Sequence, residues 1–205
     1  MEEKKLSEQE SLLIIQQMIQ TAKQEQKDDG LGWILWGWLL FSASALTWFN
    51  MKFEWFSVYL FWNIFGIIAG LLMIYEMTRN LFFKRKEKVK TYTNDLFRRL
   101  NGGFFIFLIM IILSVNLGVQ PVKGFALLLG LYGFWILIYG TALNFKPSLI
   151  GAFVCWGFGF GALFVKDHHF DETMILHGLA VLSGYIIPGH LANIEFKKIN
   201  RTGVV

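Results

Sequence analysis

The densest group of side chains with metal or proton chemistry lies in the stretch KDHHFDE, residues 166–172. It contains Asp167, His168, His169 and Asp171. Imidazole nitrogens and carboxylate oxygens together make ligand sets for zinc and similar ions. The spacing is unlike that of a helical ligand pair, because the two histidines are adjacent and their side chains point in different directions. Two interpretations stay open, a metal or proton-sensing site and a solvated turn.

A second candidate site lies in SGYIIPGHLAN, residues 183–193. Pro188 has no N–H to donate to the carbonyl of Gly184, and its ring crowds that carbonyl. This predicts a kink or local unwinding over residues 184–189, where Tyr185, His190 or water would supply the missing donor. Such a kink either steers the end of a helix or gathers polar groups into an ion or substrate site.

Asn63 is the third candidate, because it lies inside a long apolar run. An amide at that depth in a membrane is expected to face a partner on another helix. A continuous polar path along Asn63, Tyr185 and His190 would indicate a transporter or channel. The apolar runs contain no central acidic residue, which carriers driven by protons or sodium usually have, and this weakens that interpretation.

The sequence favours a protein that is not an enzyme and needs no cofactor. It contains no P-loop, GxSxG, HExxH or Rossmann glycine pattern. A lipid-modifying activity is left open, although its candidate acid–base residues, His168, His169, His190 and Glu76, form no convincing pair. The single cysteine, Cys155, lies in an apolar run and is interpreted as a packing residue.

The composition indicates the elements that must position these residues. The chain has 205 residues, 55% of them hydrophobic and 17% charged, where soluble domains carry about 25% charge. A helix crosses the hydrocarbon core with about 20 apolar residues, and lipid requires helical hydrogen bonding. Six runs satisfy this length: 31–49, 55–77, 103–119, 124–144, 148–165 and 173–193. The predicted fold is therefore all-α, a polytopic membrane protein with six transmembrane helices arranged as three hairpins.

The distribution of Lys and Arg predicts the orientation of these spans. Sixteen of the nineteen lie in residues 1–30, in 79–99, at Lys146 and in the tail, and only Lys52, Lys123 and Lys166 lie on the other side. Basic connections stay in the cytoplasm, so both termini are expected there. The expected location is the bacterial inner membrane, with lipid bilayer as the first partner.

Five regions follow from this reading. Residues 1–30 form an amphipathic cytoplasmic helix, with Ser7 and Glu10 spaced as a capping box. A membrane hairpin over 31–78, a basic cytoplasmic loop over 79–102, a four-helix membrane region over 103–193 and a cytoplasmic tail over 194–205 complete the chain. The acidic N-terminal helix is expected to dock on the basic loop of the same or a neighbouring subunit.

The basic loop is the predicted surface for a protein partner or for lipid headgroups. Its candidate residues are Lys84, Arg85, Lys86, Lys88, Arg98 and Arg99. The positive-inside pattern is enough to explain their charge, and binding of anionic lipid would explain it as well. No nucleic-acid-binding motif accompanies them, so nucleic acid is not an expected partner. Pairs of small residues, Gly66 with Gly70 and Gly157 with Gly161, indicate close helix packing within the chain or in a homo-oligomer.

The order of these features resembles that of small bacterial inner-membrane proteins whose role is not known. The resemblance rests on LSEQESLLII at 6–15, FKP at 145–147 and YIIPG at 185–189. It implies a six-helix architecture and a bacterial origin, and it brings no catalytic residues. We expect a non-enzymatic membrane protein with a sensing, scaffolding or regulatory role through its cytoplasmic helix and basic loop. The alternative is a small oligomeric transporter or channel subunit with a pathway near the kinked sixth helix.

Overall fold

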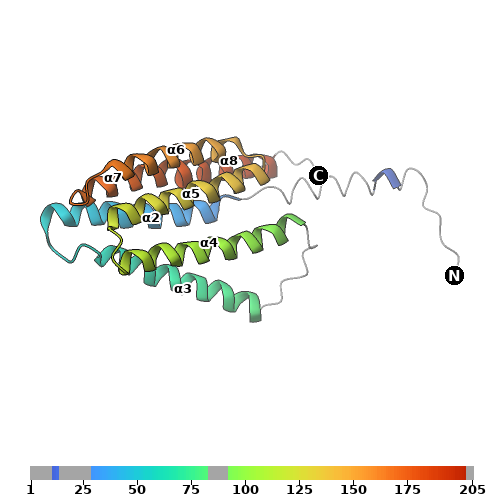
Figure 1. Ribbon diagram of the computed structural model, residues 1–205. Coiled ribbons are helices and arrows are strands. Elements are labelled where there is room, and N and C mark those ends of the chain that lie inside the picture. Colours follow the sequence, from blue (N-terminus) through green and yellow to red (C-terminus); the bar gives the residue numbers. More distant parts are fainter. Residues whose placement is uncertain (1–10, 14–28, 83–91, 202–205) are drawn as a thin grey trace.

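The computed structural model describes residues 11–13, 29–82 and 92–201, and this part of the chain is helical with no strand. The long helices run side by side (Figure 1). Their bounds are α2 Leu31–Phe53, α3 Leu60–Phe82, α4 Tyr92–Asn116, α5 Pro121–Ala142, α6 Lys146–Phe164, α7 Phe170–Val181 and α8 Ile187–Arg201, with a π-helical turn, η1 Leu182–Ile186, joining α7 to α8.

Five of these helical segments are long and apolar enough to cross a membrane, which confirms the predicted class of helical membrane protein. They are Leu31–Phe53, Arg99–Asn116, Pro121–Ala142, Lys146–Phe164 and Phe170–Lys198. The second predicted span, 55–77, corresponds to a shorter apolar segment, Leu60–Tyr75. Helix α6 begins as the sequence predicts, with Pro147 in its first turn, where a missing N–H has no helical partner to lose.

The segment predicted as the basic loop, 79–102, is helical wherever the structure describes it. Residues 79–82 continue α3, and residues 92–102 form the first turns of α4. The predicted amphipathic helix over 1–30 and the tail after residue 201 lie outside the described residues, apart from 11–13, 29 and 30.

The core of the bundle lies among α2, α5, α6 and the α7–η1–α8 segment. Leu129, Ile136, Ala152, Cys155 and Val181 are fully buried there. Small residues permit a close approach between α6 and η1. A Cβ atom added to Gly151 would lie 2.8 Å from the carbonyl oxygen of Ser183, so the two backbones leave no room for a side chain.

Helices α3 and α4 are attached to this core more loosely. Within the described residues, the backbone of α3 neighbours α2 only and that of α4 neighbours α5 only, and the two do not neighbour each other. Ile67 and Leu71 on α3 and Ile106 on α4 are each more than 60% exposed. Gly66 and Gly70 have no atom of another helix within 4 Å of an added Cβ, so neither glycine is at a close helix contact within the described part of the chain.

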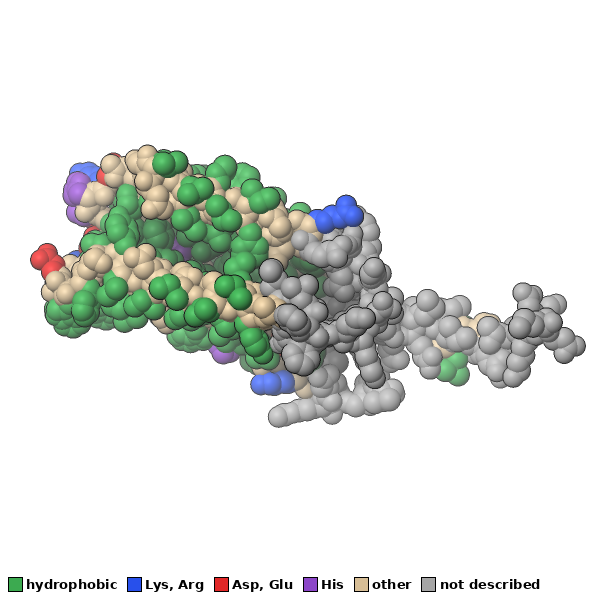
Figure 2. Space-filling view, turned by 90° about the horizontal axis from the view of Figure 1, so that it is seen from below, with side chains coloured by type: hydrophobic (Ala, Val, Ile, Leu, Met, Phe, Trp, Pro, Cys, Tyr) green, Lys and Arg blue, Asp and Glu red, His purple; other side chains and the backbone are tan. Residues whose placement is uncertain are grey.

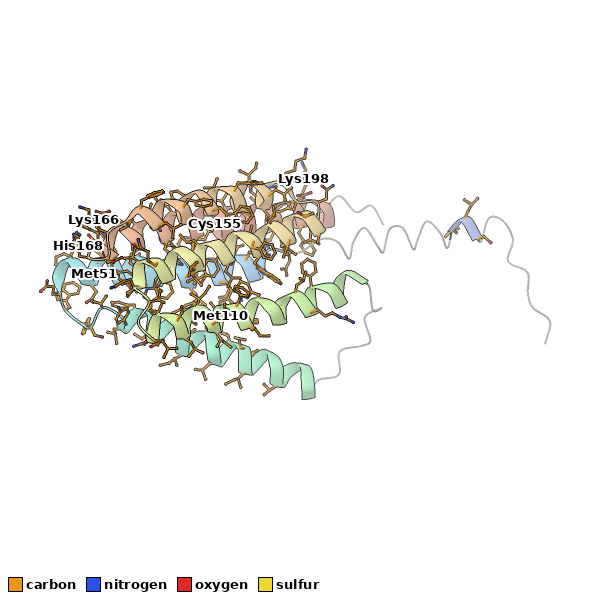
Figure 3. The ribbon with its side chains drawn as sticks, viewed as in Figure 1. Met51, Met110, Cys155, Lys166, His168 and Lys198 are labelled. Atoms are coloured by element: carbon orange, nitrogen blue, oxygen red, sulfur yellow. The ribbon has the colours of Figure 1, made fainter. Side chains whose placement is uncertain are left out.

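The two ends of the bundle differ from its apolar middle. Hydrophobic side chains cover most of the face seen in Figure 2, and the coloured acidic side chains lie at one end. Lys166 and His168 mark that end, which we call the His168 end, and Lys198 marks the other, the Lys198 end (Figure 3). At the Lys198 end the Asn193 side chain donates a hydrogen bond to the Asp29 carbonyl at 2.7 Å, which ties α8 to the start of α2.

Candidate functional site: a buried polar cluster and an apolar groove

A cluster of polar side chains lies buried between α2 and α7. Ser44 and Thr47 come from α2, Thr173 and His177 come from α7, and none is more than 1% exposed. Residues three or four apart lie on one face of a helix, so each helix presents its pair to the other. We call these four residues, together with the indole N–H of Trp48, the polar cluster.

A hydrogen bond joins the Ser44 and His177 side chains within the polar cluster. Ser44 Oγ lies 2.7 Å from His177 Nδ1 and 2.9 Å from the Leu40 carbonyl oxygen. A hydroxyl has one proton. In one arrangement Ser44 donates this proton to the Leu40 carbonyl, and His177 Nδ1 carries the ring proton and donates it to Ser44. In the other arrangement Ser44 donates to Nδ1, and the proton of the neutral ring is on Nε2. The orientation of the Ser44 hydroxyl and the tautomer of His177 are therefore coupled, and either combination satisfies the contact between them.

Four buried polar atoms around this pair have no hydrogen-bond partner in the described part of the chain. They are Thr47 Oγ1, Trp48 Nε1, Thr173 Oγ1 and His177 Nε2. An unsatisfied buried donor or acceptor costs about 1–3 kcal/mol, and several together favour a small polar guest or a water between α2 and α7. Hydroxyl, imidazole and indole groups offer both donors and acceptors to such a guest.

Aromatic rings close the cluster on its other side. The ring centroids of Trp62, Phe125 and Tyr132 lie 5.2, 5.5 and 5.8 Å from that of His177, all with edge-to-face geometry. Such rings exclude water from the imidazole. Ser44 and His177 have the residue types of a nucleophile and a base, but the pair is enclosed and its contacts include no orienting carboxylate, so the arrangement gives no hydrolase site.

An apolar groove lies on the other side of α5. It has a volume of about 740 Å³ and is lined by residues of α4, α5 and α6. The lining residues are Arg99, Leu100, Gly103, Phe104, Phe107, Met110, Ile111, Ala126, Leu127, Gly130, Leu131, Phe134, Trp135, Ile138, Trp156, Gly159, Phe160 and Leu163. Figure 3 labels Met110 on the α4 wall. Arg99 is the single charged residue of this lining. It belongs to the N-terminal part of α4, which lies at the same end of the bundle as the C-terminal part of α8 (Figure 1).

The side chains of the predicted metal site at residues 166–172 make separate pairwise contacts and do not converge on one point. Asp171 accepts a hydrogen bond from Lys52 at 2.9 Å, Asp167 lies 3.9 Å from Lys123, and the His169 imidazole lies 3.3 Å from Glu172. The His168 and His169 rings lie 4.2 Å apart between centroids. Among the described residues no group of three or more His, Cys, Asp or Glu has the arrangement to hold a metal ion, so the metal site stays a prediction that this geometry does not support.

The predicted kink region contains the π-helical turn. The N–H of Ile187 donates to the carbonyl of Leu182, a five-residue step, directly before Pro188. Gly184, Tyr185 and Pro188 are buried and His190 is exposed. Tyr185 packs against the rings of Trp33 and Tyr132, with centroids 5.0 and 5.6 Å apart.

Asn63 does not join Tyr185 and His190. It is the fourth residue of α3, close to the His168 end, and its side chain is exposed. The reason lies in the turn before it. Asn50 folds that turn back by donating to the carbonyls of Phe56 and Ser57 and accepting from the Phe56 N–H at 2.9 Å, which delays the start of α3 to Leu60.

The predicted basic surface is described only at its edge. Lys84, Arg85, Lys86 and Lys88 lie outside the described residues, and Arg98 is described by its backbone in α4. Arg99 lines the mouth of the groove.

The fold and the two candidate sites define a helical membrane protein that encloses a small polar cluster and carries an apolar groove on its surface. No protein-family model, curated protein or solved structure matches the chain. Function must therefore be argued from the geometry.

Proposed function

We propose that this chain is a non-enzymatic protein of the bacterial inner membrane with a sensing, scaffolding or regulatory role. In this proposal α3 also crosses the membrane, as the second of six spans, the six spans form three hairpins, and both termini face the cytoplasm. The charge distribution supports the orientation, because sixteen of the nineteen Lys and Arg belong to residues 1–30, to 79–99, to Lys146 and to the tail, the segments that the positive-inside pattern assigns to the cytoplasm. The basic segment around Lys84–Lys88 would meet anionic lipid, a protein partner or a second copy of the chain.

The observation that carries this function is the separate support of α3 and α4. These two helices flank the basic segment, yet within the described residues the backbone of α3 neighbours that of α2, the backbone of α4 neighbours that of α5, and the two do not neighbour each other. The Trp62 ring of α3 also packs against Phe125 of α5 and His177 of α7. The basic segment thus joins two helices whose backbones have different neighbours in the core. A change in the packing of either helix would move that segment relative to the core, as a sensor requires.

A distance measurement tests the sensing role. Spin labels at Ile74 of α3 and Ile106 of α4, which are 60% and 70% exposed, report the separation of the two helices in a Cys155→Ala background. We expect the distance distribution to change when phosphatidylglycerol is added to phosphatidylcholine vesicles. A control pair at Leu46 and Phe153, on α2 and α6, is expected to stay constant, and an unchanged Ile74–Ile106 distribution would reject sensing of anionic lipid.

The orientation has its own test in the same cysteine-free background. A cysteine at Asp167, between α6 and α7, is expected to react with a membrane-impermeant thiol reagent on intact cells. A cysteine at Thr141, in the last turn of α5 at the opposite end, is expected to react only after lysis. Both residues are exposed. The reverse labelling pattern would contradict the proposed orientation.

The polar cluster favours a second candidate function, a small oligomeric transporter or channel subunit. Four unpartnered polar atoms inside an apolar bundle are unusual unless something polar binds or passes there. The test measures proton flux and sodium flux across proteoliposomes that contain the purified protein. A carrier would show flux above empty vesicles that Thr47→Val and Thr173→Val abolish, and absence of flux for both ions would reject ion transport.

A further inference from the structure

We propose that the groove between α4, α5 and α6 binds one acyl chain of an anionic phospholipid, with the lipid phosphate at Arg99. This inference adds a ligand to the proposed function. Only the consequence of binding, a change in the position of the basic segment, rests on that proposed function. The site itself is argued from the shape, lining and charge of the groove.

The length of the groove matches the depth of one leaflet. On α4 its lining runs from Arg99 to Ile111, and on α5 from Ala126 to Ile138. Each interval is twelve residues, or about 18 Å at 1.5 Å per residue. Half of the hydrocarbon core is about 15 Å, so an acyl chain that starts at the headgroup level ends within the groove.

The volume favours a single chain over a protein helix. A helix of 10 Å diameter and 18 Å length occupies roughly 1,400 Å³, about twice the 740 Å³ of the groove. Gly103 and Gly130 widen the groove at its middle, since a Cβ added to either would meet no atom within 4 Å. A flexible hydrocarbon chain fits an irregular channel lined by Phe104, Phe107 and Trp135 without matching a fixed shape.

The charge at the mouth selects the headgroup. Arg99 is the first residue of the apolar stretch Arg99–Asn116, which places its guanidinium level with lipid phosphates when α4 spans the membrane. A guanidinium binds phosphate oxygens through two parallel hydrogen bonds. A second basic residue, Arg98, precedes it in α4, so this part of α4 attracts anionic lipid in preference to zwitterionic lipid.

The test measures lipid retained by the purified protein. Protein reconstituted in vesicles of equal phosphatidylglycerol and phosphatidylcholine is released into detergent and its lipid adducts are counted by native mass spectrometry. We expect one retained lipid per chain, with phosphatidylglycerol preferred about fivefold for one basic side chain at the surface. Arg99→Gln is expected to abolish the preference while an adduct remains.

A groove-filling variant and a matched control separate the groove from general lipid contact. Gly130→Phe places a ring inside the groove and is expected to lose the retained lipid. Gly157→Phe adds the same ring to an exposed glycine of α6 that also has open space around it and lies outside the lining, and it is expected to retain the lipid. Equal melting temperatures of the two variants confirm that both fold.

Several outcomes would overturn the inference. They are absence of a retained lipid on the wild-type chain, retention by Gly130→Phe equal to wild type, and no headgroup preference before the Arg99 change. A dimer that Gly130→Phe dissociates would assign the groove to a second copy instead. A retained lipid together with an unchanged Ile74–Ile106 distance would support the site and reject the sensing role, so the two proposals fail separately.

Discussion

The crossing of α6 and η1 yields a sharp prediction for Gly151. Replacing it with alanine puts a Cβ 2.8 Å from the Ser183 carbonyl oxygen and 3.1 Å from the Gly184 Cα. Ordinary contacts between such atoms begin near 3.5 Å, so the two backbones must separate by about 0.7 Å. Both obstructing atoms belong to the backbone and cannot rotate away. Overpacking of this kind costs about 1–3 kcal/mol.

The same change at Gly157 isolates this cost. Gly157 lies on α6, and a Cβ there meets nothing within 4 Å. The gain in helix propensity from glycine to alanine, about 1 kcal/mol, is common to both variants and cancels in their comparison. We therefore expect Gly151→Ala to be less stable than Gly157→Ala by about 1–3 kcal/mol, or about 2–12 °C in melting temperature for a chain of this size.

The chain provides its own reporter for this experiment. Cys155 is its single cysteine and is 0% exposed, and its Cβ would lie 3.7 Å from a Cβ added to Gly184. A thiol-reactive fluorophore in detergent solution therefore reports opening of the α6–η1 crossing during heating. Equal melting temperatures for the two variants, or a more stable Gly151→Ala, would refute the close backbone approach of α6 and η1.

Three further predictions concern hydrogen bonds and charge. Asn50→Ala removes three bonds that fold the turn after α2 and is expected to cost about 1–3 kcal/mol, visible as faster proteolysis of residues 54–59. Ser44→Ala leaves the buried imidazole nitrogen without its 2.7 Å partner and is expected to lower the melting temperature, whereas Ser42→Ala, exposed on the same helix, is expected to leave it unchanged. Lys52→Gln breaks the half-exposed pair with Asp171 and is expected to cost less than about 1 kcal/mol, with the difference shrinking at high salt.

The helices were predictable from sequence because lipid imposes a length and a hydrogen-bonding rule on every span. Apolar runs of sufficient length, with Pro147 at a helix start, are local signals, and the structure has five such helices and one shorter apolar segment. Asn63 was misplaced because its depth depends on where α3 begins. That start is set by the side chain of Asn50 reaching six and seven residues ahead, which hydropathy does not register.

The polar cluster was not predicted from the sequence, although a histidine inside an apolar run, such as His177, costs too much in lipid to face outward. Serine and threonine satisfy their hydroxyls on their own helix at small cost, as Ser183 does with Leu179. A single Ser44 or Thr47 therefore carries no signal. The signal lies in the two pairs together: Ser44 and Thr47 are three residues apart in one apolar run, and Thr173 and His177 are four apart in another. This pattern becomes meaningful only once α2 and α7 are known to be neighbours.

Helix α5 separates the groove from the polar cluster and contacts both. Tyr132 lies 5.8 Å from His177 between ring centroids and 6.5 Å from Phe104, which lines the groove. An occupant that displaces Phe104 therefore changes the packing of Tyr132, and through it the surroundings of the imidazole. Adjacent packing transmits a signal only when it has two stable arrangements, and α4 is the groove element whose backbone neighbours α5 alone within the described residues. If the proposed lipid binds and shifts α4, Phe104 and Tyr132 provide the two ring contacts that connect the groove to the buried histidine.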